Sequence, residues 1–337
     1  MYSTHADLFK NITAWVRHRS NSTKMIWVKG HSGIQAADRL ANEGALKPLP
    51  PLDPLPPPPN NTIPTGAKLS TMAQRDFYRG IKMANKPPPR RSTQRNLDRI
   101  QACATEYFNN SPTHAAIWKS TKNKDFTKKT REFLWKCIHN AFKIGKFWDN
   151  IPGYETRGTC AHCNVEESME HILTECDAPG RTEVWALANE LWHKRSDSPI
   201  PTNYGAILGC GLTNFTKDQG KPDTGLNRLF RIIVSESMYL IWKIRCERAI
   251  TWGNDPSKLH APHEIHNKWL LSINSRLKID SVQTNRKIFR KKVLDSKTVL
   301  KTWKKCLKDN IHNTKNWCGK TGVLVGIAPK RPPGRNR

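Results

Sequence analysis

Residues 160–176 read CAHCNVEESMEHILTEC, and the spacing of cysteine and histidine in this segment is the most informative pattern in the chain. Two cysteines separated by two residues, Cys160 and Cys163, form a tight turn in which both thiolates can face one ion. His171 and Cys176 follow at short range and complete a Cys₃His set suited to tetrahedral zinc. The residues between them have the pattern of a helix start, which would place His171 on the helix and Cys176 near its end. We therefore predict a structural zinc site.

Two other interpretations use the same residues. The four side chains could be small buried groups that cluster without a metal, or two of the thiols could form a disulfide. The nine cysteines are odd in number and scattered, and the first fifteen residues lack the charged-then-apolar pattern of a secretory signal. Reduced thiols around a metal therefore fit better than a disulfide framework. We expect an intracellular protein, with the nucleus as one compartment, and not a secreted one.

The surplus of positive charge indicates the kind of partner. Fifty-six lysines and arginines face 28 acidic residues, which gives a formal charge of +28 and a pI near 10.0. Such a surplus of like charges repels itself unless an anionic partner neutralises it. Nucleic acid is the usual partner, although acidic lipid or an acidic protein would also serve. No apolar run approaches the roughly 20 residues that cross a bilayer, so we expect no membrane-spanning segment, and we take nucleic acid rather than a membrane as the partner.

The organisation of the chain follows from two proline clusters. Residues 48–59 contain eight prolines in twelve positions, which favours a polyproline spacer over a ligand for a proline-binding domain. The second cluster lies at residues 87–89. We therefore divide the chain into a motif-bearing module, a proline-rich linker, a short helix with a basic proline-rich linker, a mainly helical domain and a basic tail, at residues 1–47, 48–67, 68–91, 92–316 and 317–337.

The helical domain shows apolar periodicity in three long segments. Residues 130–148 are predicted to form a helix that leads into the cysteine segment, and residues 228–250 are apolar over more than half of the helical circumference, as in a central core helix. Residues 286–308 are predicted to form a basic helix with a buried apolar stripe and an exposed face that binds phosphate. The apolar stripe comprises Phe289, Val293, Leu300, Trp303 and Leu307, and the candidate nucleic-acid-binding residues are Arg290, Lys291, Lys292, Lys301, Lys304 and Lys305.

The first module carries a second motif. Residues 27–33 (WVKGHSG), followed by residues 36–41 (AADRLA), resemble the last strand, histidine loop and final helix of type 1 ribonuclease H. The resemblance implies a partial α/β module of helix, strand and helix, and a Mg²⁺-dependent cleavage of RNA in RNA–DNA hybrids. It matches Asp38 to the helix carboxylate that helps to bind Mg²⁺, and His31 to the mobile loop histidine.

Two departures from the family pattern bear on activity. The other three metal-binding acids of the family precede this motif, and the only acid before it here is Asp7, which does not align with a catalytic position. His31 and Asp38 also lie only seven residues apart, because a triplet of the family is missing. Two divalent ions need clustered carboxylates, so we expect this chain alone to be inactive.

A second resemblance covers residues 130–330. The segments FLWK (133–136) and GVLVGI (322–327), with the cysteine segment, are similar to the zinc-binding region that follows ribonuclease H in non-LTR retroelements and in fungal proteins derived from them. The matched positions include His139, Gly145 and Glu167. Together the two resemblances imply a retroelement-derived ribonuclease H-like protein. The alternatives are a zinc-stabilised nucleic-acid-binding module without chemistry and a decayed reading frame; the sequence names no protein partner.

Overall fold

The computed structural model describes residues 12–16, 35–48, 72–85, 88–217, 220–308, 317–320, 322–332 and 334. The chain divides into two compact units, residues 1–88 and 89–337, and each is considered by itself.

The first unit is described as separate helical pieces. Residues 12–16 are helical, and α2 (Gln35–Ala45) and α3 (Gln74–Ala84) follow. Helix α3 buries none of its residues, and the side chains described in α2 are exposed. The predicted strand at residues 24–28, His31 and the proline-rich segment beyond residue 48 lie outside the described residues. The helix–strand–helix module therefore remains an expectation.

The second unit is a helical domain. Over its described residues the regular structure is helical, with isolated β-bridges and no strand. Its long and short α-helices are α4 (Arg91–Phe108), α5 (His114–Ser120), α6 (Lys128–Ile138), α7 (Arg181–Trp192), α8 (Tyr204–Leu208), α9 (Thr224–Cys246), α10 (Pro262–Gln283), α11 (Arg286–Phe289) and α12 (Ser296–Thr302). None of the helices in the described ranges combines the length and apolarity that a membrane crossing requires.

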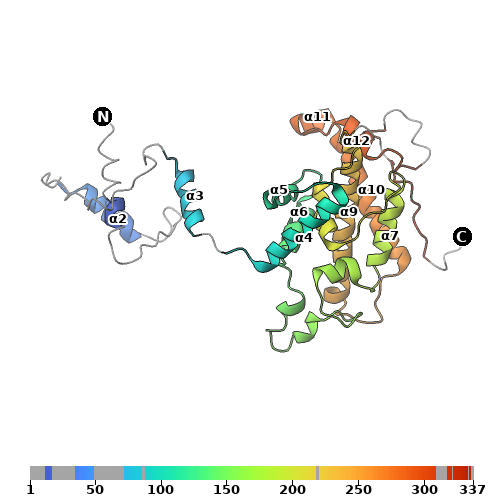
Figure 1. Cartoon of the computed structure of the whole chain (residues 1–337), viewed down its shortest axis with the longest axis horizontal. Coiled ribbons are helices and arrows are strands. Elements are labelled where there is room, and N and C mark those ends of the chain that lie inside the picture. Colours follow the sequence, from blue (N-terminus) through green and yellow to red (C-terminus); the bar gives the residue numbers. More distant parts are fainter. Residues whose placement is uncertain are drawn as a thin grey trace. The chain divides into compact units, whose positions relative to one another are not determined.

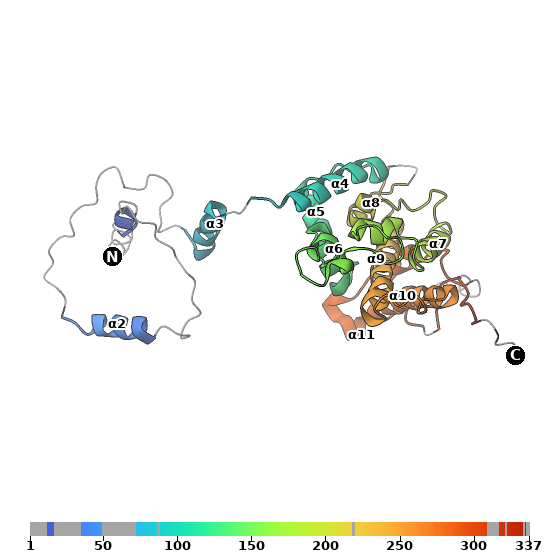
Figure 2. The same cartoon turned by 90° about the horizontal axis from the view of Figure 1, so that it is seen from below.

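Helix α9 forms the centre of this domain, as residues 228–250 predicted. It packs against α6, α7, α8, α10 and α12, and α4 and α10 lie on opposite sides of it (Figure 1, Figure 2). Its first turn is capped by Asp223, whose carboxylate accepts a hydrogen bond from the Leu226 amide at 2.9 Å. Because α9 is contacted on most sides, it buries apolar residues around nearly its whole circumference.

A buried ion network fixes α9 to its neighbours. Arg228 donates to Asp280 on α10 at 2.6 Å and to Asp125 at 2.9 Å, and the Trp303 indole donates to Asp280 at 2.9 Å. The Asp280 side chain is fully buried. Removal of one partner from such a pair leaves an uncompensated buried charge, which typically costs about 3–5 kcal/mol. The sequence patterns did not reveal this network.

Two predicted helices are shorter than expected. The helix predicted over residues 130–148 ends at Ile138, because Asn140 takes a left-handed backbone (φ 48°), and Ala141 is exposed. The helix predicted over residues 286–308 is wrong as a single element. It is divided into α11, a 3₁₀ turn (Arg290–Lys292) and α12, with a left-handed residue at Arg290 (φ 44°).

The physical reason for the second break is a cap in the middle of the segment. The Asp295 carboxylate accepts hydrogen bonds from the Thr298 amide and hydroxyl, each at 3.0 Å, and so starts a new helix. Of the predicted apolar stripe, Trp303 and Leu307 are buried, whereas Phe289, Val293 and Leu300 are only half-buried.

The predicted boundary at residue 316 also differs from the structure. Val325 pairs with Leu307 in an isolated antiparallel bridge, its amide donates to Asn274 at 2.9 Å, and Ile327 is buried. Burial alternates along the segment, since Val323, Val325 and Ile327 are buried and Leu324 and Ala328 are exposed, so one of its sides packs on the core. The described residues of 317–328 therefore belong largely to the helical domain, although Lys320 is exposed.

Candidate metal centre

A tight turn holds the first two cysteines. The Cys160 amide donates to the Val165 carbonyl and the Asn164 amide donates to the Cys160 carbonyl, both at 2.8 Å. Asn164 takes a left-handed backbone (φ 54°), which asparagine tolerates better than most residues. The Cys163 sulfur accepts a hydrogen bond from the Asp177 amide at 3.4 Å. The loop therefore fixes both sulfurs before any ion is considered.

The other two candidate ligands come from a π-helical turn, His171–Glu175. In an α-helix, residues five apart point about 140° away from each other. The wider turn is closed by a hydrogen bond from the Cys176 amide to the His171 carbonyl at 2.7 Å, and it brings both side chains to the same side. Such π turns are rare and often occur at functional sites. The sequence indicated a helix here but not its widened form.

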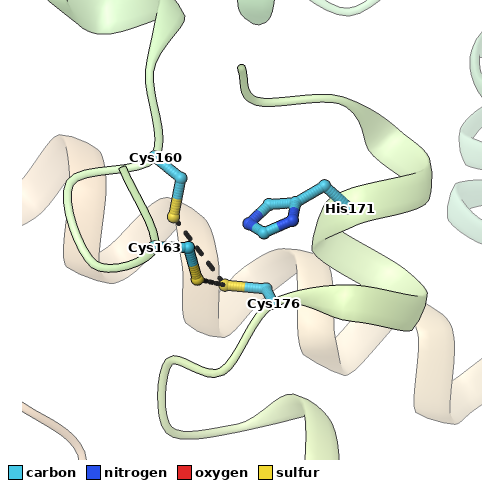
Figure 3. Close-up of side chains that lie close together, drawn as sticks. All are labelled: Cys160, Cys163, His171 and Cys176. Carbon is cyan, nitrogen blue, oxygen red and sulfur yellow. Dashed lines mark hydrogen bonds between the residues drawn. The ribbon is translucent and has the colours of Figure 1, made fainter. Parts of the chain in front are cut away.

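The four side chains converge on one point (Figure 3). The Cys176 sulfur lies 3.8 Å from the sulfurs of both Cys160 and Cys163, and the ligand atoms of all four residues lie within 4.8 Å of one another. Thiolates bound to zinc at about 2.3 Å in a tetrahedron are separated by about 3.8 Å. The structure thus contains a Cys₃His cluster whose geometry could hold a metal such as zinc.

The electrostatics of the cluster also fit a cation. His171 is 5% exposed, and its Nε2 atom is buried with no hydrogen-bond partner among the described residues. The Cys176 thiol shares a proton with Cys160, which lowers the pKa of Cys160 to about 3 and raises the pKa of Cys176 above its ordinary value. A divalent ion would take the place of this proton and would use the orphaned nitrogen.

The cluster is anchored to the helical core. The Arg245 guanidinium on α9 forms an ion pair with Glu167, with the Nε–Oε1 bond at 2.8 Å. The Trp185 indole on α7 donates to the Leu173 carbonyl at 2.8 Å. Gly145 has φ 53°, and a Cβ atom there would lie 2.4 Å from the Glu167 carbonyl oxygen, so this position requires glycine. Helices α7 and α9 therefore position the loop that carries the cysteines.

A second group of possible ligands is arranged differently. Glu247, His260 and Glu264 also have ligand atoms within 4.8 Å of one another. The Lys268 ammonium lies 2.8 Å from Glu247 and 2.9 Å from Glu264, and His260 lies 3.0 Å from Glu247. Lys268 balances one of the two negative charges and contacts both carboxylates, so this group is arranged as an ion-pair cluster.

The predicted Mg²⁺ site stays an expectation. Asp38 lies exposed on α2, and no group of three possible ligands in the described ranges includes it. His31 lies outside the described residues. Two other histidines near the cysteine segment lie outside the Cys₃His cluster. His139 stacks on Trp118 with ring centroids 4.7 Å apart, and His162 is exposed.

The structure places all six predicted phosphate-binding residues at the surface. Arg290, Lys291 and Lys292 lie on the 3₁₀ turn, and Lys301, Lys304 and Lys305 lie at and beyond the end of α12, so the two groups are not on one helical face.

Sequence reasoning missed other basic residues that line a cavity beside the cysteines. Lys143, Arg157 and Arg248 line a cavity of about 390 Å³ that also contacts Cys160. One signal was available: Arg157 is an arginine only three residues before the first ligand cysteine. The approach of Arg248 to the loop depends on α9 and could not be obtained from spacing.

Comparison with known proteins finds no matching family model, no matching curated protein and no matching solved structure.

Proposed function

We propose that this chain is a zinc-stabilised nucleic-acid-binding protein that does not hydrolyse its ligand by itself. The observation that carries the proposal is the convergence of three thiols and the orphaned nitrogen of His171 within a domain of high positive charge. Cys160, Cys163, His171 and Cys176 would hold the zinc, which supplies four strong bonds between the cysteine loop and the π-helical turn. The zinc has a structural role, because all four coordination positions are taken by protein ligands.

The charge of the chain supports nucleic acid as the ligand. Several carboxylates of the helical domain are already paired with arginine or lysine, as in the Arg228–Asp280 and Lys268–Glu264 pairs. A large excess of cations remains at the surface, including all six residues predicted to bind phosphate. Such surfaces attract polyphosphate backbones. The affinity falls as the salt concentration rises, because binding releases counterions into the solution.

A binding experiment tests this proposal. The full chain, purified under reducing conditions, should contain about one zinc per chain and should bind labelled single-stranded and duplex nucleic acids with a strong salt dependence. Anisotropy measured over a salt series gives the slope, and elemental analysis gives the metal content. Absence of zinc together with absence of binding at low salt would contradict the proposal.

Ribonuclease H ancestry is a second candidate, and the WVKGHSG motif at residues 27–33 favours it. Under this hypothesis the chain would cut the RNA of an RNA–DNA hybrid in the presence of Mg²⁺. We expect only background cleavage, because the sequence matches only one of the four metal-binding acids of the family, Asp38. Cleavage that Mg²⁺ supports and that Asp38→Asn abolishes would instead establish the enzyme.

A further inference from the structure

The cysteine loop and the turn that extends α9 line a cavity beside the predicted zinc ligands. It encloses about 390 Å³, and its lining includes Cys160 and Ala161 of the cysteine loop on one side and Arg248, in the turn that extends α9, on the other. This volume lies within the range of small-ligand pockets. The metal cluster therefore forms part of the wall of a ligand-sized cavity.

The charge in this cavity is positive. Glu167 is the one carboxylate among the described residues that line it, and Arg245 already neutralises Glu167 through their ion pair. Lys143, Arg157 and Arg248 also line it, and no carboxylate among the described residues pairs with them. A zinc-bound Cys₃His centre would carry one negative charge, so the three cations still leave the cavity with a net positive charge, which favours an anionic ligand.

Arg248 provides an independent indication of a ligand. It is 9% exposed, and no carboxylate among the described residues pairs with its guanidinium. None of its nitrogen atoms is both fully buried and unpartnered, so the guanidinium keeps access to solvent, and it lines the cavity. A mostly buried arginine usually pairs with an anion, because an unpaired buried charge is costly. An anion in the cavity would supply the missing partner, and phosphate oxygens match the planar guanidinium well.

An aromatic shelf lies at the same cavity. The Arg157 guanidinium is held over the rings of Trp148, at 5.3 Å, and Tyr154, at 4.6 Å. Trp148 lines the cavity, and Tyr154 is 45% exposed. Stacked arginine and aromatic planes are the surfaces on which unpaired bases stack.

We propose that this cavity binds one unpaired nucleotide of a single-stranded nucleic acid, with its phosphate on Arg248 and Lys143 and its base against the shelf of Arg157, Trp148 and Tyr154. The proposal rests on the proposed nucleic-acid binding and gives it a location. The bases of a duplex are paired and stacked, so they cannot enter this cavity unless they are flipped out of the helix. An acidic peptide would satisfy the cations but would make no use of the aromatic shelf.

The test compares two double variants of equal charge. Lys143→Gln/Arg157→Gln removes two exposed cations of the cavity, and Lys122→Gln/Lys124→Gln removes two exposed cations of the turn between α5 and α6, which belongs to no proposed binding surface. Binding of the zinc-loaded full chain to fluorescein-labelled oligothymidylate is measured over a salt series. The cavity variant should lose at least about tenfold in affinity and flatten the salt slope by about 1.4, at about 0.7 per cation for a single strand. The control variant should bind oligothymidylate with an affinity and a salt slope close to those of the parent chain.

Arg248→Gln is the second variant, and its folding is checked by zinc content. With one zinc retained, it should weaken oligothymidylate binding and reduce the preference for single strand over duplex. Equal losses in the cavity and control variants, or no loss in the cavity variants, would overturn the proposal while the parent chain still binds. Failure of the parent chain to bind any nucleic acid would refute the proposed function as well. Competition by polyglutamate as strong as by oligothymidylate would assign the cavity to acidic peptides.

Discussion

The Cys₃His cluster and the Glu247–His260–Glu264 cluster both bring their candidate ligand atoms within 4.8 Å of one another, but they differ in the type of ligand atom and in their counter-charge. In the first, the His171 Nε2 atom has no hydrogen-bond partner among the described residues, and the Cys176 sulfur lies as far from the other two sulfurs as thiolates around one zinc do. In the second, the Lys268 ammonium contacts both carboxylates, and the His260 ring packs against Trp252 in a tilted arrangement, with ring centroids 4.4 Å apart.

The difference shows that proximity of ligand atoms does not by itself define a metal site. A lysine bridges the two carboxylates of the second cluster, whereas the first cluster keeps a buried nitrogen without a hydrogen-bond partner among the described residues. The orphaned nitrogen therefore distinguishes the two clusters better than distance does.

The largest expected effect is loss of the metal. Cys163→Ser should remove zinc and unfold the loop and π-helical turn, because structural zinc contributes on the order of 10 kcal/mol in small modules. Zinc content and hydrogen exchange over residues 158–180 measure the change. Cys103→Ser, a half-buried thiol of α4 outside the cluster, is the matched control and should retain zinc. Unchanged hydrogen-exchange protection together with one zinc per chain in Cys163→Ser would contradict the assignment of the Cys₃His cluster as the metal site.

Loss of the lysine tests the second cluster. Lys268→Met should lower the free energy of unfolding by about 1 kcal/mol, because these ion pairs are partly exposed, and should lower Tm by about 2–4 °C for a domain of this size. Thermal unfolding measures the shift. The parent chain should bind one zinc, and a second tightly bound equivalent lost on mutation of Glu247 and Glu264 would show that both clusters are metal sites.

Acid should weaken the second cluster through Glu247. Hydrogen bonding to Lys268 and His260 lowers the pKa of Glu247, so the folded state binds its proton less readily than the unfolded state. Its contribution is therefore present above the ordinary glutamate pKa of about 4.3 and is lost as pH falls through the lowered value. Chemical unfolding from pH 6 downward should show a smaller acid loss for Lys268→Met than for the parent chain. Equal pH profiles would contradict this role of the lysine.

The smallest effect on folding is expected from the exposed lysines. Lys291, Lys292, Lys304 and Lys305 are exposed and are not required by either cluster, so the quadruple glutamine variant should change the free energy of unfolding by less than about 0.5 kcal/mol. The same variant should flatten the salt slope for duplex binding by up to about three units, if each lysine neutralises one phosphate. An unchanged slope would place the duplex contact elsewhere on the domain.

Local patterns predicted some elements well and others poorly. The central helix was found because α9 is apolar on nearly all sides, a property that depends only on its own residues. The basic segment was predicted as one helix because its periodicity continues through residues 286–308. Its interruption depends on the Asp295 cap and on pairing of Leu294 with the Gln283 carbonyl at 2.9 Å, which is a contact between elements.

The sequence by itself determined which residues could form the metal centre, because the turn between Cys160 and Cys163 and the short distance to His171 and Cys176 are local. It also determined the excess of positive charge. Only the tertiary structure decided that a π-helical turn aligns His171 and Cys176. It also decided that Lys268 contacts both carboxylates of the Glu247–His260–Glu264 cluster, and that Arg248 lines the cavity beside Cys160. Covalent neighbours fix spacing, whereas counter-charges and cavity walls come from residues distant along the chain, and packing alone brings these together.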